Sequence, residues 1–212
     1  MIYKNRQDAG RQLAEKLMKF KDENPIIIAL PRGGVVTGYE AAKMLHAPLD
    51  VMITRKLGAP FQLELAIGAI APNDVRILNL DAIRFLGISK DEMEEIIRRE
   101  TKEMHRRIKL YRGDLPPLDL SGKTVIIVDD GLATGVTAGV AVLSIKQMTP
   151  EKIILAVPVS PIDTAEKFRE EVDEFICLSE PPDFFAVGQY YDDFAQVTDE
   201  EVISLLELTR KI

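Results

Sequence analysis

Several residue types and patterns are missing from this sequence, and each absence excludes a class of protein. The 212 residues include no tryptophan and a single cysteine, so an internal disulfide cannot form. Cys177 lies in the apolar run FICL, which predicts a buried structural thiol and no redox role. No apolar run approaches the about 18 residues of a membrane span, and the N-terminus MIYKNRQD is too polar for a signal peptide. We therefore expect a cytoplasmic protein.

Excess positive charge and histidine clusters are also missing. The chain has 27 Lys and Arg against 34 Asp and Glu, a net charge of -7, so no basic stripe for nucleic acid is expected. Its two histidines, His46 and His105, have no partner at metal-ligand spacing, which argues against a zinc site and against a histidine-based nucleophile. A hydrophobic content of 46% is ordinary for a globular protein.

The hydrophobic pattern is typical of an α/β protein. Short apolar runs alternate with stretches of helical period, which predicts crossover units around a mostly parallel twisted sheet with helices on both faces. Several runs are apolar on every residue, as strands covered on both sides should be. The length favours one domain over residues 1–212 rather than two equal ones. Strands are expected at 25–30, 49–54, 65–71, 75–80, 124–128, 152–159 and 174–178.

Four helices carry start signals, and one of them forms a long charged insertion. The region of about 81–112 predicts a helical insertion, in which a helix over 89–112 has acidic residues early and basic residues late, as the helix dipole favours. Its basic residues form either a solvated face or a patch for an anionic ligand. The start signals are Asn5 before 6–20, and the capping boxes Ser89 with Glu92, Asp163 with Glu166, and Thr198 with Glu201.

The window 124–137, TVIIVDDGLATGVT, carries the clearest chemical signal. A buried strand is followed by two carboxylates, a Gly/Thr turn and a helical stretch, so unpaired N–H groups at the helix start would face whatever lies beyond the strand. Gly131 and Gly135 allow close backbone approach to an anion, and the hydroxyls of Thr134 and Thr137 can donate to it. Asp129 and Asp130 can accept from a sugar diol or hold Mg²⁺. One aspartate acting as a helix cap is the structural alternative.

This window closely resembles the phosphoribosyl-diphosphate (PRPP) motif of type I phosphoribosyltransferases. The resemblance implies transfer of phosphoribosyl from PRPP to a nitrogenous base, with Mg²⁺-assisted release of pyrophosphate. Asp129 and Asp130 would hold the ribose and the metal ion. The loop that would bind the 5′-phosphate consists of Gly131, Leu132, Ala133, Thr134, Gly135, Val136 and Thr137.

Two further windows extend the resemblance. ALPRGGVVTG at 29–38 is similar to the family's pyrophosphate loop, with Arg32 reaching the leaving group, Gly33 and Gly34 allowing close approach, and a cis peptide at Pro31–Arg32. TRKLGAP at 54–60 is similar to the Arg-Lys pair that precedes a mobile active-site loop, which assigns Arg55 and Lys56 to the pyrophosphate. Without the resemblance, the first window is a common glycine-rich turn and the second a solvated pair.

The acceptor-side residues are less well defined by the sequence. Ala133 stands where hypoxanthine-guanine enzymes carry an aspartate, which argues against 6-oxopurine acceptors without establishing adenine. Glu64 is a candidate acid near the acceptor, or a solvated loop carboxylate. The C-terminal segment of about 180–212 would form a hood in which Tyr190 or Tyr191 stacks on the base, unless its aromatic cluster is a packed edge or a dimer contact.

Two other functions share these residues. A PRPP- or nucleotide-sensing regulatory module would keep the phosphate site and act on a partner. A ribose-phosphate hydrolase or phosphorylase would use the same pocket with water or phosphate as the acceptor. The retained Arg32, Arg55 and Lys56 favour the transferase, because a sensor has less need to stabilise a leaving group. A homodimer would be in keeping with the resemblance.

Overall fold

The computed structural model describes residues 2–210, without the side chains at positions 63 and 64, and it contains two separate sheets. The larger sheet has five strands, all parallel, in the order β2-β1-β6-β7-β8. This confirms the predicted α/β class. The strands are β1 (Ile26–Ala29), β2 (Leu49–Val51), β6 (Thr124–Val128), β7 (Lys152–Val159) and β8 (Glu174–Ser179).

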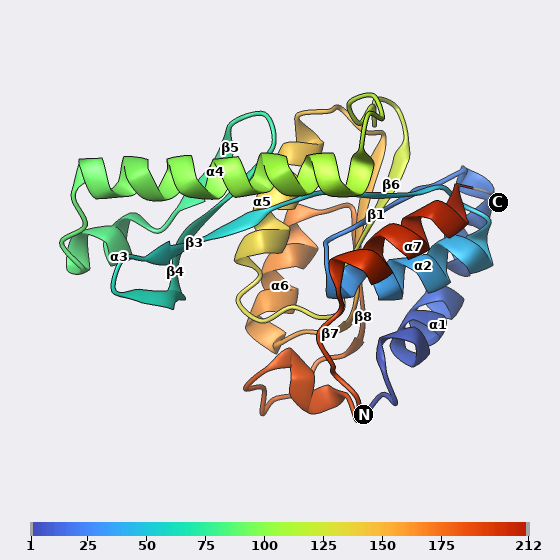
Figure 1. Ribbon diagram of the computed structural model, residues 1–212. Coiled ribbons are helices and arrows are strands. Elements are labelled where there is room, and N and C mark those ends of the chain that lie inside the picture. Colours follow the sequence, from blue (N-terminus) through green and yellow to red (C-terminus); the bar gives the residue numbers. More distant parts are fainter. Residues whose placement is uncertain (1, 211–212) are drawn as a thin grey trace.

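Helices cover both faces of this sheet because successive strand residues point to opposite sides (Figure 1). Ile126 and Val128 of β6 pack with α1 (Arg6–Leu17) and α2 (Gly33–Leu45). Val125 and Ile127 pack on the other side with α5 (Val136–Lys146) and α6 (Ile162–Glu171). All five residues of β6 are therefore buried, as the unbroken apolar run predicts.

The smaller sheet belongs to an arm that projects from the body (Figure 1). It is antiparallel, in the order β3-β4-β5. The runs at 65–71 and 75–80 were expected in the parallel sheet; they lie in this sheet instead, because the short turn at 72–74 permits only a hairpin. The arm consists of β3 (Arg55–Ala59), β4 (Gln62–Ala71), β5 (Val75–Leu78), α3 (Leu80–Phe85) and α4 (Lys90–Arg112).

The strand β3 replaces the loop that was predicted after Lys56. Gly58 and Pro60 suggested an irregular segment, but the chain stays extended to Ala59 and pairs with β4. Register shifts on either side of Gly58 absorb the irregularity as bulges. The hairpin turn then falls at 60–61, where Phe61 is exposed.

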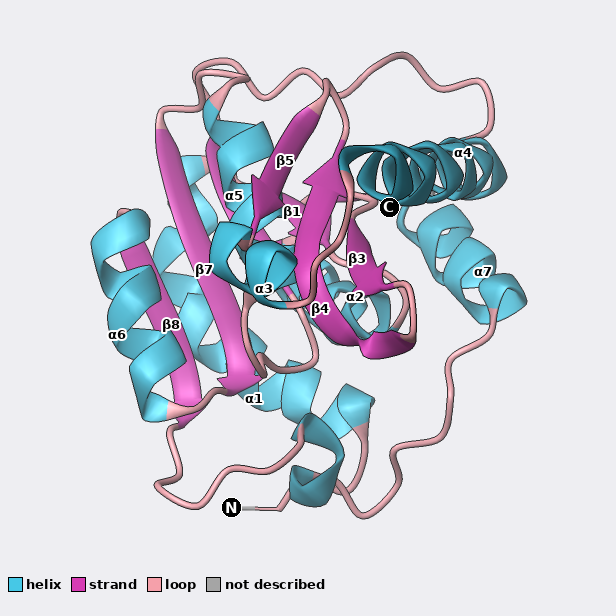
Figure 2. Ribbon diagram, turned by 90° about the vertical axis from the view of Figure 1, so that its left-hand side faces the viewer, coloured by secondary structure: helices cyan, strands magenta, loops and turns pink. Residues whose placement is uncertain are grey.

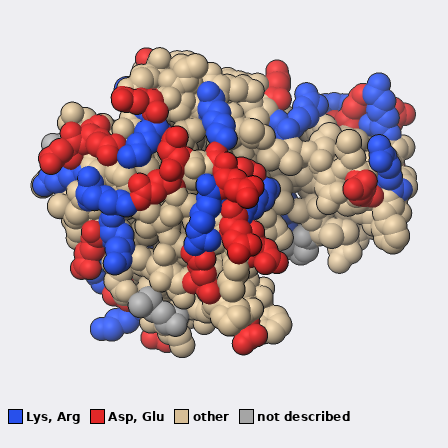
Figure 3. Space-filling model, turned by 180° about the vertical axis from the view of Figure 1, so that it is seen from behind, with Lys and Arg blue, Asp and Glu red and all other residues tan. Residues whose placement is uncertain are grey.

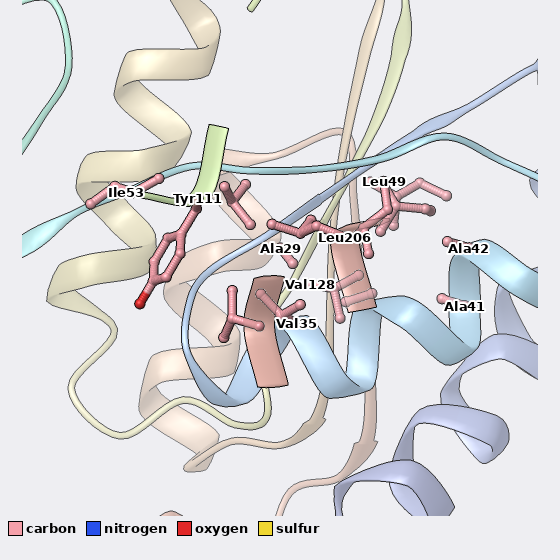
Figure 4. Close-up of a cluster of buried hydrophobic side chains, with 14 of the residues drawn as sticks. Ala29, Val35, Ala41, Ala42, Leu49, Ile53, Tyr111, Val128 and Leu206 are labelled. Carbon is pink, nitrogen blue, oxygen red and sulfur yellow. The ribbon is translucent and has the colours of Figure 1, made fainter. Parts of the chain in front are cut away.

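The helix α4 confirms the predicted charged insertion and joins the arm to the body. Met93, Met104 and Tyr111 are buried along one side of it, and Tyr111 lies in the same cluster as Val35 and Leu206 (Figure 4). On its exposed side, Glu103 pairs with Arg106 and Arg107 of the same helix. These internal pairs support the solvated-face interpretation of the basic residues.

Three of the four predicted helix starts are confirmed. Asn5 caps α1, and both Ser89 and Thr198 form capping boxes, the latter at α7 (Asp199–Thr209). The box at Asp163 is wrong, because α6 begins at Ile162 after Pro161, whose fixed φ sets the start two residues earlier. Asp163 lies in the first helical turn, where its charge still suits the dipole.

The N-terminal residues pair with the C-terminal segment. Tyr3 forms a parallel bridge with Tyr191, supported by backbone hydrogen bonds from Tyr3 N to Tyr190 O and from Asp192 N to Tyr3 O. Two short 3-10 helices, Met18–Glu23 and Val187–Tyr190, complete the fold. Among the described residues, no helix combines the length and apolarity needed to cross a membrane. Acidic and basic side chains are mixed over the back of the molecule (Figure 3).

Candidate active site

The predicted site lies where two neighbouring strands of the parallel sheet end. β1 and β6 are paired, with Ala29 opposite Val128. The chain leaves β1 towards α2 on one face and leaves β6 towards α5 on the other. Such a reversal opens a crevice beyond the carboxyl ends of the strands, which is where open α/β sheets bind ligands. Two of the three windows singled out in the sequence therefore meet at one place.

The loop after β1 lies directly against the two aspartates. The Pro31–Arg32 peptide is cis, as the resemblance implies. A Cβ atom on Gly33 would come within 1.8 Å of Asp130 Oδ2, and one on Gly34 within 2.9 Å of Asp129 Oδ1. No side chain fits in either gap, so both glycines are required for this close approach. Gly33 and Gly34 therefore allow the backbone of this loop to approach both carboxylates, and any ligand bound to them, closely.

The aspartates differ in their environment. Asp129 Oδ1 accepts a hydrogen bond from the Asp130 backbone N–H at 2.8 Å. Desolvation by the surrounding protein, and then the neighbouring charge of Asp130, raise the pKa of Asp129 well above its usual range. Asp130 Oδ2 accepts from Arg6 Nε at 2.6 Å, so its charge is compensated. Paired carboxylates with unequal environments are typical of functional sites.

Arg6 is a site residue that sequence reasoning missed. It donates from Nη1 to Ala195 O at 2.8 Å, and its guanidinium lies 3.7 Å from the centre of the Phe194 ring. Only 11% of its side chain is exposed. Arg6 and Asp130 are 124 residues apart, and no local pattern connects them. The cap at Asn5 predicted where α1 begins, but it gave no indication that Arg6, the first residue of the helix, pairs with Asp130.

The loop 131–137 is anchored at its base and open at its tip. Leu132 is buried, and its N–H donates to Val159 O, so this residue anchors the loop and has no N–H left for a phosphate. Thr164 Oγ1 donates to Ala133 O at 2.9 Å. Thr134 is exposed, and no described residue hydrogen-bonds the hydroxyl of Thr134 or Thr137. Those hydroxyls and the backbone N–H groups at the start of α5 can donate hydrogen bonds to an anion.

Arg32 and Arg55, which were both predicted to bind pyrophosphate, pair with acids from outside the five-stranded sheet. Arg32 Nη1 lies 3.9 Å from Asp199 Oδ1 at the start of α7. Arg55, on β3, donates from Nε at 2.9 Å and from Nη2 at 2.7 Å to Glu100 Oε2 on α4. Lys56 follows on β3 and is half-buried. Glu100 and Asp199 were also missed, because neither stands near its arginine in the sequence.

The residues predicted to contact the acceptor base are Tyr190, Tyr191 and Glu64. Tyr190 and Tyr191 are packed inside the C-terminal segment, at 7% and 6% exposure, and Tyr191 lies between Tyr3 and Phe194. The packed-edge alternative therefore describes them, and stacking on a base would require them to leave this cluster. Tyr191 also donates to Asp130 O at 2.6 Å, which ties the segment to the motif. The side chain of Glu64 lies outside the described residues.

Asp129 and Asp130 fit Mg²⁺ only when a bound substrate supplies further oxygen ligands. Among the described residues, no group of three or more His, Cys, Asp or Glu side chains could hold a metal ion. Asp130 Oδ2 is engaged by Arg6, which leaves Oδ1 as its open acceptor. Mg²⁺ commonly binds through one or two carboxylates together with waters and substrate phosphates. The arrangement fits a metal ion that arrives with a diphosphate rather than one held by the protein alone.

Comparisons with known proteins agree with the geometry. The family profile "Phosphoribosyl transferase domain" matches residues 1–195. Proteins of two Mycobacterium tuberculosis strains, named as suggested phosphoribosyl transferases, are 43% identical over 97% of this chain; the chain spans 46% of their length, about half. The crystal structure of TT1426 from Thermus thermophilus has a TM-score of 0.80 at 37% identity, over 97% of this chain and 98% of that one.

Proposed function

The chain belongs to the phosphoribosyl transferase family, and from that premise we propose that it transfers phosphoribosyl from PRPP to a nitrogenous base and releases pyrophosphate. The observation that supports this most directly is the contact between the loop after β1 and the two aspartates after β6. The turn 131–137 would then bind a phosphate, the two aspartates would accept from a sugar diol, and the loop after β1 would bring Arg32 to the same crevice, which together would recognise PRPP.

Each part of PRPP has a matching group in this crevice. The loop 131–137 would hold the 5′-phosphate through backbone N–H groups and the hydroxyls of Thr134 and Thr137. Asp129 and Asp130 Oδ1 would accept from the ribose hydroxyls. The diphosphate would lie against Gly33 and Gly34, with the guanidinium groups of Arg32 and Arg55 and the Lys56 ammonium towards its oxygens. Binding at the remote 5′-phosphate would orient the anomeric carbon.

The chain's own groups would act mainly by electrostatics and orientation. The bond between the anomeric carbon and the diphosphate oxygen breaks, and its electron pair leaves with pyrophosphate. The acceptor nitrogen supplies the pair for the new bond, and its proton passes to the departing pyrophosphate or to water. Arg32, Arg55 and Lys56 stabilise charge that grows on the leaving group. When bound, Mg²⁺ would neutralise further diphosphate charge, with Asp129 or Asp130 as its protein contact, directly or through water.

The test is pyrophosphate release from PRPP and Mg²⁺ across a panel of purines, pyrimidines and other ring-nitrogen acceptors. We expect release that depends on one base and falls by about 10³-fold in the Asp129→Asn/Asp130→Asn protein, in line with loss of a main electrostatic contact. Asp81→Asn is the matched control, since Asp81 is an exposed carboxylate on the arm whose loss should change nothing.

Three outcomes would contradict the proposal. Release without any base would indicate hydrolysis. PRPP binding in calorimetry without turnover on the whole panel would indicate a regulatory module. Full activity in the double variant, with an unchanged circular dichroism spectrum, would place the site elsewhere.

A further inference from the structure

We infer that α4 positions both arginines of the proposed pyrophosphate site, acting on Arg55 through Glu100 and on Arg32 through Tyr111 and Asp199. This inference rests on the proposed function, because it assigns the two arginines to the leaving group. It gives the helical insertion a task beyond covering the core. Figure 2 shows α4 beside both β3 and α7, the elements that carry Arg55 and Asp199.

The first connection runs from Glu100 to Arg55. Glu100 is 8% exposed in the middle of α4, where a carboxylate without partners would be costly. Its Oε2 accepts both Nε and Nη2 of Arg55, and its Oε1 accepts from Arg99 Nε at 3.1 Å. Two donors of one guanidinium fixed on one oxygen define the plane of the group. The Nη1 end of Arg55 has no partner among the described residues and stays available to a ligand.

The second connection runs from Tyr111 to Arg32. Tyr111, at the last turn of α4, is 2% exposed and donates its hydroxyl to Asp199 Oδ1 at 2.5 Å. Burial and this hydrogen bond raise the pKa of Tyr111 to about 12, so the hydroxyl keeps its proton as a donor. The same Asp199 oxygen faces Arg32 at 3.9 Å. Arg210 also donates to the Tyr111 carbonyl, which joins α7 to α4.

Positioning and charge neutralisation predict effects of opposite sign. If Glu100 only added negative charge near the site, Glu100→Gln would reduce repulsion and tighten the binding of pyrophosphate. If it positions Arg55, the same variant frees the guanidinium to sample other rotamers, and binding weakens. The direction of the change in pyrophosphate binding therefore separates the two roles. A purely structural role of Glu100 predicts the same change whether or not Arg55 is present.

The experiment is a double-mutant cycle read by calorimetry with pyrophosphate plus Mg²⁺, and separately with PRPP plus Mg²⁺. The proteins are wild type, Glu100→Gln, Arg55→Gln and the double variant, with Glu95→Gln as control because Glu95 is an exposed acid of the same helix that pairs with Arg98. We expect Glu100→Gln to weaken binding by about tenfold in the wild-type background and by less than about twofold when Arg55 is already glutamine.

Tyr111→Phe provides a second variant that keeps the buried ring and removes only the hydroxyl. We expect it to weaken binding by about threefold, with no further loss in an Arg32→Gln background. Thermal unfolding of each variant shows whether the fold is kept. If Glu100→Gln unfolds, the Tyr111 arm of the experiment still decides.

Each result supports or overturns the inference. Tighter or unchanged binding in Glu100→Gln, or an equal loss in both backgrounds, would overturn positioning while leaving the proposed function in place. Absence of pyrophosphate and PRPP binding in the wild-type protein would overturn the proposed function itself, and this inference with it.

Discussion

The five-stranded sheet and the arm differ in how much of their surface is covered. Every residue of β6 is buried, whereas Phe61 and Phe85 of the arm are 94% and 90% exposed. A strand covered on both faces can carry polar side chains only where it ends, so the body contributes aspartates and backbone N–H groups at strand ends. The arm has a solvated face, and it contributes Arg55, Lys56 and the acid that holds Arg55. The aspartates and the glycine-rich loops thus belong to the body, whereas Arg55 and Lys56 belong to the arm and Arg32 to the body.

The largest expected effect tests whether stability resides in the body. Ile126→Ala removes a fully buried side chain from the central strand and should lower the free energy of unfolding by about 2–5 kcal/mol. Phe85→Ala, on the arm, should change it by no more than about 0.5 kcal/mol. Urea unfolding followed by circular dichroism measures both. Similar losses in the two variants would contradict the comparison.

A second test compares two glycines with nearly the same backbone. Gly135 in the loop 131–137 has φ of 68°, and a Cβ there would lie 2.6 Å from the Phe168 ring. Gly87 on the arm has φ of 64° and no atom within 4 Å of its Cβ position. Gly87→Ala should lower the unfolding free energy by about 1 kcal/mol, the cost of the left-handed backbone. Gly135→Ala should lower it by about 2–4 kcal/mol, because overpacking is added.

Thermal unfolding measures that difference in stability. Calorimetry with inorganic phosphate measures whether the loop 131–137 still binds an anion. Gly135→Ala should also weaken phosphate binding, whereas Gly87→Ala should leave it unchanged. Equal destabilisation by the two substitutions would mean that Phe168 moves aside without cost.

A third, smaller effect uses the two capping boxes. Thr198 Oγ1 accepts from Glu201 N at 3.1 Å, and Ser89 Oγ accepts from Glu92 N at 3.3 Å. Thr198→Ala and Ser89→Ala should each reduce the unfolding free energy by about 1 kcal/mol. Only Thr198→Ala should also weaken pyrophosphate binding, because Asp199 follows it and faces Arg32. Loss of binding in Ser89→Ala instead would mean that the far end of the arm contacts the ligand.

A separate test concerns Cys177, whose alkylation rate measures how well β8 is covered. Burial raises the pKa of its thiol to about 12, and the thiol donates to Ser179 O. The reactive thiolate is therefore scarce at pH 8 and grows only as the pH rises towards 12. Iodoacetamide labelling at pH 8, followed by mass spectrometry, should be about 10³-fold slower in the folded protein than in urea. Equal rates would show that β8 opens readily.

Much of the fold could be predicted because the parallel strands are short, unbroken apolar runs, and three of the helix starts carry caps. The arm was harder to predict. Alternation in β4 looks the same in parallel and antiparallel sheets. Gly58 in β3 and Pro60 just after it favour a loop, and the bulged pairing of β3 with β4 overrides the preference at Gly58. The false capping box at Asp163 arose because Pro161 sets the helix start independently of the motif.

The site was predictable where it is local in sequence. The two aspartates, the loop 131–137 and the cis peptide each lie in one continuous window. Arg6, Glu100 and Asp199 could not be predicted, since each meets its partner only through tertiary packing over long sequence separations. The sequence left open whether Tyr190 and Tyr191 stack on a base or form a packed edge, because composition shows that aromatic residues cluster but not which way they point. Tyr191 packs on Tyr3, a residue from the opposite end of the described chain.

The pairing of Tyr3 has a consequence for synthesis on the ribosome. Its hydroxyl bonds to Pro158 O, 155 residues further along the chain, and its backbone pairs with Tyr190 and Asp192 later still. At ordinary translation speeds, about 10–30 s pass before the first of these partners emerges. During that interval the segment around Tyr3 carries an aromatic side chain without its native cover. The hydrogen bond from Tyr191 to Asp130 O therefore forms only after both of these distant segments have been synthesised.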